Sequence, residues 1–255
     1  MSGSSGPDMT EKARKKLLLP GVTVTAPAAG PITLLALGGR QPTAKWFQAA
    51  SCSAVSLCAV DKGVSVCREA GLIPHRLTGD CDSARAEDWQ WAESCGAVVD
   101  RYQSDKDFTD FQLALALCSE KAGEAGEGDG ALLLTGCFGG RFDHLWSTVI
   151  SFLKLSGRNQ PLGMADDSEG LFFLTGPGEL TAKFSRQPEA ISLISFSEET
   201  TGLCLSGLHW PLENTTLKYA VPYSISNRAE SSLITLSCLS GTVGLYWVFK
   251  EEKCS

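Results

Sequence analysis

The sequence predicts an α/β fold in which a parallel-sheet α/β domain is followed by an all-β sandwich domain. Between residues 32 and 155, short apolar runs alternate with segments suited to helices, which is the pattern of a parallel sheet covered by helices. Beyond about Asp166 the apolar runs are separated by Gly, Pro, Ser and Asn, with no strong helix between them. We therefore expect domains at residues 32–166 and 167–255, after a tail at residues 1–31.

Each strand expected in the first domain is a short apolar run that ends at a glycine or an aspartate. The expected strands cover residues 32–37, 54–60, 76–78, 97–99 and 131–135, and the helices cover residues 42–50, 64–70, 84–95, 109–121 and 142–155. The second domain is expected to contain strands at residues 171–174, 179–184, 191–196, 215–219 and 232–238. Ligands of open α/β sheets bind beyond the carboxyl ends of the strands, so residues that follow the strands are site candidates.

Composition excludes several classes of protein. The net charge of -7 and the pI near 5.1 argue against a nucleic-acid-binding protein, which usually has a basic face. No apolar run reaches the ~18 residues of a membrane span, so we expect no membrane segment.

The 10 cysteines include no Cys-x-x-Cys pair and lie mostly in apolar runs, which favours reduced core thiols and a cytoplasmic location. The segment Met1–Gly6 looks like an expression tag or a flexible tail.

Acidic residues gather at the expected strand ends. Asp61 follows one strand, Asp80 and Asp82 follow the next, and the segment 105–110 adds three more aspartates. Two carboxylates about 4 Å apart repel by roughly 4 kcal/mol at an effective dielectric near 20, so such a cluster seldom converges without a cation. Carboxylate oxygens are the ligands that hard divalent cations prefer, and we expect Mg²⁺.

Two of these acidic positions also have simpler interpretations. Asp80 could be a turn residue whose side chain bonds its own backbone. In the segment 105–110, Asp107 could cap the following helix, and Asp110 could be a first-turn acid that complements the helix dipole. Capping needs only one or two acids, so the metal interpretation is preferred.

A glycine-rich turn follows the strand at residues 131–135 and opens a helix. Gly139 and Gly140 would let backbone N–H groups approach an anion, and Arg141 could bind phosphate in a bidentate fork. The alternative is a simple glycine turn with an ion pair between Arg141 and Asp143. His144 could equally be a buried structural residue.

In the second domain, the segments 207–212 and 224–227 stand out. Trp210 could stack on a flat ligand, although a tryptophan in a β domain is more often a core residue.

Taken together, these motifs resemble the thiamin pyrophosphokinase family. In family order, the matching motifs are Gly38-Gly39, Asp61-Lys62-Gly63, Gly79-Asp80-Cys81-Asp82-Ser83, Asp105-Lys106-Asp107-Phe108-Thr109-Asp110, Gly139-Gly140-Arg141-Phe142-Asp143-His144, Gly207-Leu208-His209-Trp210 and Ser224-Ile225-Ser226-Asn227. Each motif alone is weak, but their order and spacing over residues 32–230 are specific. The chain departs from some family members at residues 62–65.

The resemblance implies an enzyme that transfers pyrophosphate from ATP to the hydroxyl of thiamin, releasing AMP. It implies a homodimer in which each active site lies between the catalytic domain of one subunit and the β domain of the other. The two alternatives are a non-catalytic nucleotide-binding or thiamin-binding homologue and a Mg²⁺-dependent phosphohydrolase.

The resemblance also assigns roles to residues. By similarity, Mg²⁺ is held by Asp61, Asp80, Asp82 and Asp110, and the nucleotide lies near Asp107, Thr109, Gly139, Gly140 and Arg141. The aminopyrimidine of thiamin is received by Trp210, Ser226 and Asn227. Arg141 offsets phosphate charge, and either Asp107 or Asp110 accepts the proton of the hydroxyl, with a mild preference for Asp107 because a metal ligand makes a poorer base.

Overall fold

The computed structural model describes residues 13–80, 84–102, 109–121, 130–155 and 159–250. Within them the strands form two sheets of six and nine strands. In spatial order, the six-stranded sheet contains β1 (Arg14–Leu19), β2 (Val22–Pro27), β10 (Gly178–Phe184), β14 (Leu233–Cys238), β12 (Glu199–Ser206) and β13 (Leu212–Lys218). The nine-stranded sheet contains β11 (Pro188–Ser195), β15 (Thr242–Phe249), β9 (Glu169–Thr175), β8 (Asn159–Ala165), β7 (Gly130–Thr135), β3 (Ile32–Ala36), β4 (Ser56–Val60), β5 (Arg76–Gly79) and β6 (Val98–Arg101).

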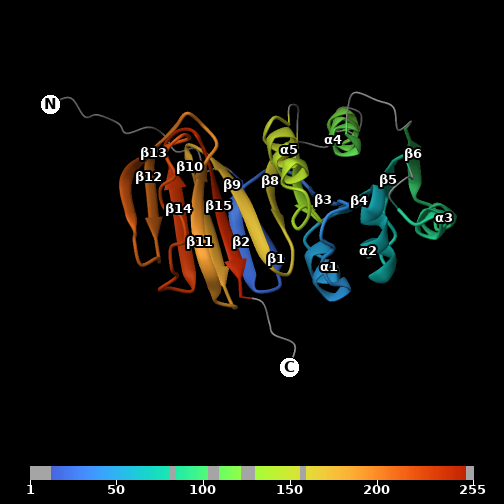
Figure 1. The fold of residues 1–255 in the computed structure, drawn as a ribbon, viewed down its shortest axis with the longest axis horizontal. Helices are drawn as coiled ribbons and strands as arrows, with labels where there is room; N and C mark the ends of the chain where they lie inside the picture. Colours follow the sequence, from blue (N-terminus) through green and yellow to red (C-terminus); the bar gives the residue numbers. More distant parts are fainter. Residues whose placement is uncertain (1–12, 81–83, 103–108, 122–129, 156–158, 251–255) are drawn as a thin grey trace.

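The nine-stranded sheet joins both halves of the chain (Figure 1). Strands β8, β7, β3, β4, β5 and β6 are parallel, as expected for the α/β half. Strand β9 then pairs with β8 in the antiparallel sense, and β15 and β11 continue the sheet on that side. The predicted fold class is confirmed, but the β half is built on an extension of the α/β sheet.

Helices cover both faces of the parallel strands (Figure 1). The helices are α1 (Ala44–Ser51), α2 (Val64–Glu69), α3 (Ala86–Ser94), α4 (Asp110–Lys121) and α5 (Phe142–Leu153), and a 3-10 turn, η1 (Asp61–Gly63), precedes α2. One core cluster combines α1, α2 and α3 with the six-stranded sheet, around residues such as Phe47 and Phe172. A second cluster lies under α4 and α5, around residues such as Phe111 and Phe152. Of the helices in the described ranges, none is long and apolar enough to cross a bilayer.

The tail predicted over residues 1–31 is wrong for residues 14–27, which form the hairpin β1–β2. Alternate residues of β2 are buried, and the strand pairs with β10, so this hairpin extends the six-stranded sheet. Residues 1–12 lie outside the described ranges. The polar Lys and Thr residues of the hairpin hid the period-2 pattern, which is visible once Leu17 and Val24 are placed on the inner face.

Besides the hairpin β1–β2, three further strands were not predicted, namely β8, β12 and β15. All three contain a glycine, which normally weakens a strand interior. Here the glycines permit close packing, because a Cβ at Gly163 would lie 2.6 Å from the Phe172 ring and one at Gly244 would lie 2.6 Å from Leu171 Cδ1. The expected placement of the cysteines is correct for Cys67, which is buried, but wrong for Cys52, Cys95 and Cys204, which are exposed free thiols.

Candidate functional site

Three of the predicted aspartates converge at the carboxyl ends of the parallel strands. Asp61 directly follows β4, Asp80 directly follows β5, and Asp110 is the first residue of α4. One carboxylate oxygen from each lies within 4.8 Å of the others, and all three residues are half-buried. The other predicted aspartates, Asp82, Asp105 and Asp107, lie outside the described residues.

Glycine and left-handed backbone make room for this cluster. Gly79 has a φ of 151°, and a Cβ at this position would lie 1.7 Å from Asp61 Oδ1. Asp61 itself has a φ of 47°, a conformation that Asp and Asn tolerate better than other side chains. The backbone N–H of Asp80 donates to Asp61 Oδ1 at 3.3 Å. The two strand ends are therefore shaped around the Asp61 carboxylate.

The donor set suits a small divalent cation. Mg²⁺ binds oxygen at 2.0–2.1 Å in an octahedral shell, so opposite ligands are about 4.2 Å apart. All three carboxylate oxygens lie within 4.8 Å of one another, an upper limit close to the spacing of opposite ligands in such a shell. Without a cation they would repel one another. Asp61, Asp80 and Asp110 are thus able to hold Mg²⁺.

Thr109 directly precedes Asp110 and caps α4. The Thr109 hydroxyl accepts from the N–H of Gln112 at 3.2 Å, and Gln112 Oε1 accepts from the N–H of Thr109 at 2.9 Å. This reciprocal pair is a capping box. The alternative in which Asp107 caps the helix falls on a residue outside the described ranges, whereas Asp110 does lie in the first turn.

The glycine turn after β7 is paired to the loop that follows β3. The N–H of Gly39 donates to the carbonyl of Gly136 at 2.7 Å, and that of Arg40 donates to Phe138 at 2.7 Å. A Cβ at Gly39 would lie 2.6 Å from the Gly136 oxygen, so the close approach of the two loops requires a glycine. The turn that carries Gly139 and Gly140 is thereby fixed to its neighbour.

Arg141 projects from this turn into solvent. Its side chain is 73% exposed and pairs with Asp143, with 2.5 Å between Nη2 and Oδ2. Hydrogen bonding from Arg141 lowers the pKa of Asp143 below its usual value. The ion pair that the sequence offered as an alternative is therefore present, and the same carboxylate accepts from the N–H of His144 at the start of α5. His144 is exposed, so the interpretation as a buried residue is wrong.

Sequence reasoning missed Arg40. Its guanidinium binds Asp166 with contacts of 2.7 and 2.9 Å, and Glu169 at 2.6 Å. The Tyr246 hydroxyl donates to the other oxygen of Glu169 at 2.6 Å. This network ties the loop after β3 to β9 and β15. The available signal was the Gly-Gly-Arg triplet at residues 38–40, which is repeated at residues 139–141.

Trp210 belongs to the segment that joins β12 to β13. These two strands lie at one end of the long axis of the molecule, and β4 and β5 lie toward the other end (Figure 1). It is 60% exposed, so the interpretation as a core tryptophan is wrong. Ser226 is also exposed, whereas Asn227 is only 2% exposed. Within a single chain, these three residues therefore lie apart from the acidic cluster.

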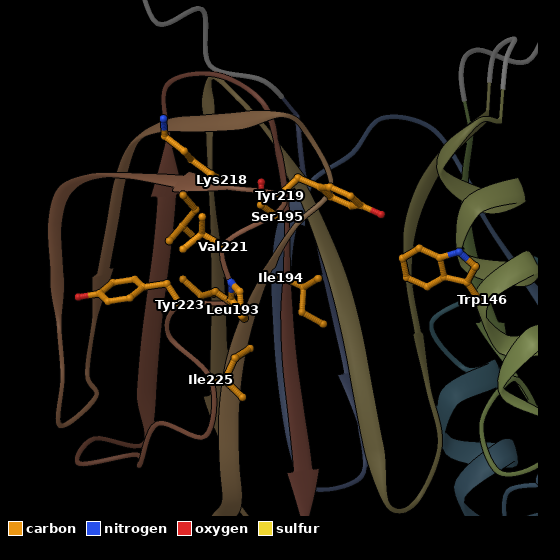
Figure 2. Close-up of a pocket in the computed structure, with 11 residues that line it drawn as sticks. Trp146, Leu193, Ile194, Ser195, Lys218, Tyr219, Val221, Tyr223 and Ile225 are labelled. Carbon is orange, nitrogen blue, oxygen red and sulfur yellow. The ribbon is translucent and has the colours of Figure 1, made fainter.

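An apolar pocket of about 310 Å³, which the sequence did not reveal, lies between the two halves of the chain. Trp146 of α5 lines one side, and β11 with the segment 217–225 lines the other. Tyr219 points toward Trp146, while Tyr223 points away from it (Figure 2). Trp146, Tyr219, Val221, Tyr223 and Ile225 are between 39% and 57% exposed. They form an apolar surface patch.

Comparison with known proteins decides the family. Residues 47–163 match the family described as thiamin pyrophosphokinase, catalytic domain, and residues 181–243 match thiamin pyrophosphokinase, vitamin B1 binding domain. A thiamine pyrophosphokinase of Bacillus subtilis is 30% identical over 182 residues, which cover 71% of this chain and 82% of the relative. The chain belongs to the thiamin pyrophosphokinase family.

Solved structures of this family have the same fold. The thiamine pyrophosphokinase of Bacillus subtilis superposes with a TM-score of 0.68 at 25% identity, covering 86% of this chain and 99% of the other. The thiamin pyrophosphokinase of Geobacillus thermodenitrificans superposes with a TM-score of 0.68 at 28% identity, covering 88% of this chain and 100% of the other. The acidic cluster and the glycine turn fall in the matched catalytic domain, and Trp210 falls in the matched vitamin B1 binding domain.

Proposed function

We propose that the protein is a thiamin pyrophosphokinase that forms thiamin diphosphate and AMP from thiamin and ATP. The observation that carries the proposal is the convergence of Asp61, Asp80 and Asp110 at the strand ends of a chain that belongs to this family. The intact cluster argues against a binding protein without catalysis. The matched vitamin B1 binding domain argues against a simple phosphohydrolase.

The acidic cluster would hold Mg²⁺, with Asp82 as a further ligand. When bound, the cation would offset negative charge on the triphosphate and so favour attack at phosphorus. Thr109, Gly139, Gly140 and Arg141 would bind the nucleotide. Arg141 is suited to this role because its present partner, Asp143, is an exposed carboxylate that a phosphate could replace.

The chemical step requires one proton acceptor. The thiamin hydroxyl oxygen forms a bond to the β-phosphorus of ATP, the bond from that phosphorus to the α–β bridging oxygen breaks, and AMP leaves. The hydroxyl proton goes to Asp107 or Asp110. Asp110 would be weakened as a base if it also holds the cation, which favours Asp107.

Thiamin would bind at Trp210, Ser226 and Asn227 of a second copy of the chain. This arrangement brings the exposed Trp210 to an acidic cluster that lies at the other end of its own chain. The exposed apolar patch formed by Trp146, Tyr219, Val221, Tyr223 and Ile225 is suited to burial in such a homodimer. A cytoplasmic location is part of this proposal, and the described cysteines form no disulfide with one another.

Incubation with ATP, Mg²⁺ and thiamin tests the proposed reaction. The expected products are AMP and thiamin diphosphate. Phosphate release without thiamin would support the phosphohydrolase, and absence of turnover would support the binding protein.

The variant Asp61→Asn tests the metal site with little disturbance of the backbone, because Asn also tolerates the left-handed conformation of this position.

We expect Asp61→Asn to lower turnover by at least about 100-fold. The melting temperature of the metal-free variant should stay the same or rise, since one repelling charge is removed. Mg²⁺ should stabilise the wild type against heat and the variant much less. Unchanged turnover together with an unchanged Mg²⁺ effect would remove Asp61 from the metal site.

Mixed dimers test whether two chains share a site. Trp210→Ala should raise the KM for thiamin by about 2- to 10-fold. When this variant is refolded together with Asp61→Asn, about half of the dimers should be mixed, and each mixed dimer carries one site with both native residues. At low thiamin, the mixture should therefore exceed the summed activities of the separate variants. Activity equal to the sum would place Asp61 and Trp210 in sites that are not shared.

A further inference from the structure

Asn227 is a buried amide in a loop whose neighbours are exposed. Its residue is 2% exposed, whereas Ser226 and Arg228 on either side are exposed. The backbone of Asn227 pairs with Ile191 of β11 through hydrogen bonds of 2.7 and 2.9 Å. The position of this side chain is therefore set by the nine-stranded sheet.

The Asn227 side chain holds the peptide groups on both sides of Trp210. Its Oδ1 accepts from the N–H of Trp210 at 3.2 Å, and its Nδ2 donates to the Trp210 carbonyl at 2.8 Å. Oδ1 also accepts from the N–H of Arg228 at 2.9 Å. With these bonds made inside a buried setting, the amide has little capacity to reach a ligand.

The Trp210 side chain is exposed, but neighbouring residues hold its backbone in place. The N–H of His209 donates to the Arg228 carbonyl at 2.9 Å, and Leu208 pairs with Ala229. The His209 ring packs edge-on against the Trp210 ring, with 4.7 Å between centroids. His209 is itself held by Glu230, with 2.5 Å between Nδ1 and Oε1. An aromatic ring on a fixed backbone loses little entropy when it stacks on a ligand.

We propose that Asn227 is a positioning residue, which fixes the Trp210 backbone on the nine-stranded sheet so that the exposed indole is presented in one orientation to the aromatic ring of the substrate. This assignment rests on the proposed function of Trp210 in thiamin binding. It replaces a direct contact between Asn227 and thiamin with an indirect action through Trp210.

A double-mutant cycle tests the assignment. Asn227→Ala should raise the KM for thiamin by about 2- to 10-fold, as Trp210→Ala does, and leave the KM for ATP unchanged. In the Trp210→Ala background, Asn227→Ala should have no further effect on the KM for thiamin. Effects that multiply would show that Asn227 acts on thiamin directly and would overturn the proposal. If Trp210→Ala alone leaves the KM unchanged, the proposed role of Trp210 fails first.

Asn227→Asp gives a second test if the alanine variant does not fold. The ionised carboxylate keeps both acceptor bonds but places an oxygen against the Trp210 carbonyl. The protonated acid restores a donor at that point. The KM for thiamin of this variant should therefore approach that of the wild type as the pH falls, relative to the wild type at each pH. A ratio that does not change with pH, in a variant that folds, would overturn the proposal.

Discussion

Two Gly-Gly-Arg turns follow the adjacent strands β3 and β7, and they place their arginines in opposite ways. Arg40 points toward buried acids, including Asp166, whose side chain is 1% exposed. Arg141 points into solvent and pairs with Asp143, two residues along the chain. The same triplet at neighbouring strand ends thus gives one arginine that is paired with buried acids and one arginine that is available to bind a ligand.

The difference lies in the partners that each arginine meets. The carboxylates that face Arg40 come from the turn before β9 and from the first residue of β9, more than a hundred residues away in the sequence, and are fixed by the sheet. The partner of Arg141 is exposed to water, where an ion pair contributes little to stability. We therefore expect substitutions at Arg141 to affect activity and those at Arg40 to affect stability.

The largest effect is expected for Arg141→Met. Loss of a charged donor to phosphate should lower kcat/KM for ATP by about 100-fold, while the melting temperature stays unchanged. Steady-state kinetics and thermal unfolding measure the two properties. Arg141→Lys, which keeps the charge but not the bidentate fork, should recover part of the activity. A large fall in stability with unchanged kinetics would reverse the role given to this turn.

Arg40→Met should act mainly on stability. Removal of one partner leaves Asp166 buried without its counter-charge, and because Arg40 is partly exposed we expect a loss of about 2 kcal/mol in the free energy of unfolding. Denaturant unfolding measures this loss, and Arg40→Lys is the matched control. If Arg40→Met unfolds like the wild type, the comparison between the two turns is wrong.

A smaller effect concerns the pH dependence of Arg40→Met. Burial raises the pKa of Asp166 above its usual value, while bonds from Ser168, Glu169 and Arg40 oppose that rise. Removal of Arg40 should raise this pKa further, so protonation of Asp166 favours the folded variant more strongly than the folded wild type. The stability deficit should therefore be largest at neutral pH and shrink as the pH falls toward 5. A deficit that grows in acid would contradict this account.

Local sequence was enough to predict the α/β half and its acidic edge. Apolar runs ending at Asp61 and Gly79 identify the strand ends, and parallel topology implies that they meet. The role of Arg40 could not be predicted, because its partners are distant in the sequence and become neighbours only through the antiparallel return of β9. The exposure of Trp210 was also unpredictable, since a tryptophan in a β domain is usually buried.

The continuity of the nine-stranded sheet has a mechanical consequence. Strands β8 and β9 join the two halves through a ladder of backbone hydrogen bonds, so the halves cannot close on a substrate as hinged domains do without breaking that ladder. In the proposed arrangement, complete sites arise from the meeting of two rigid chains. The fraction of complete sites then depends on protein concentration, and dilution below the dissociation constant of the dimer should lower the specific activity.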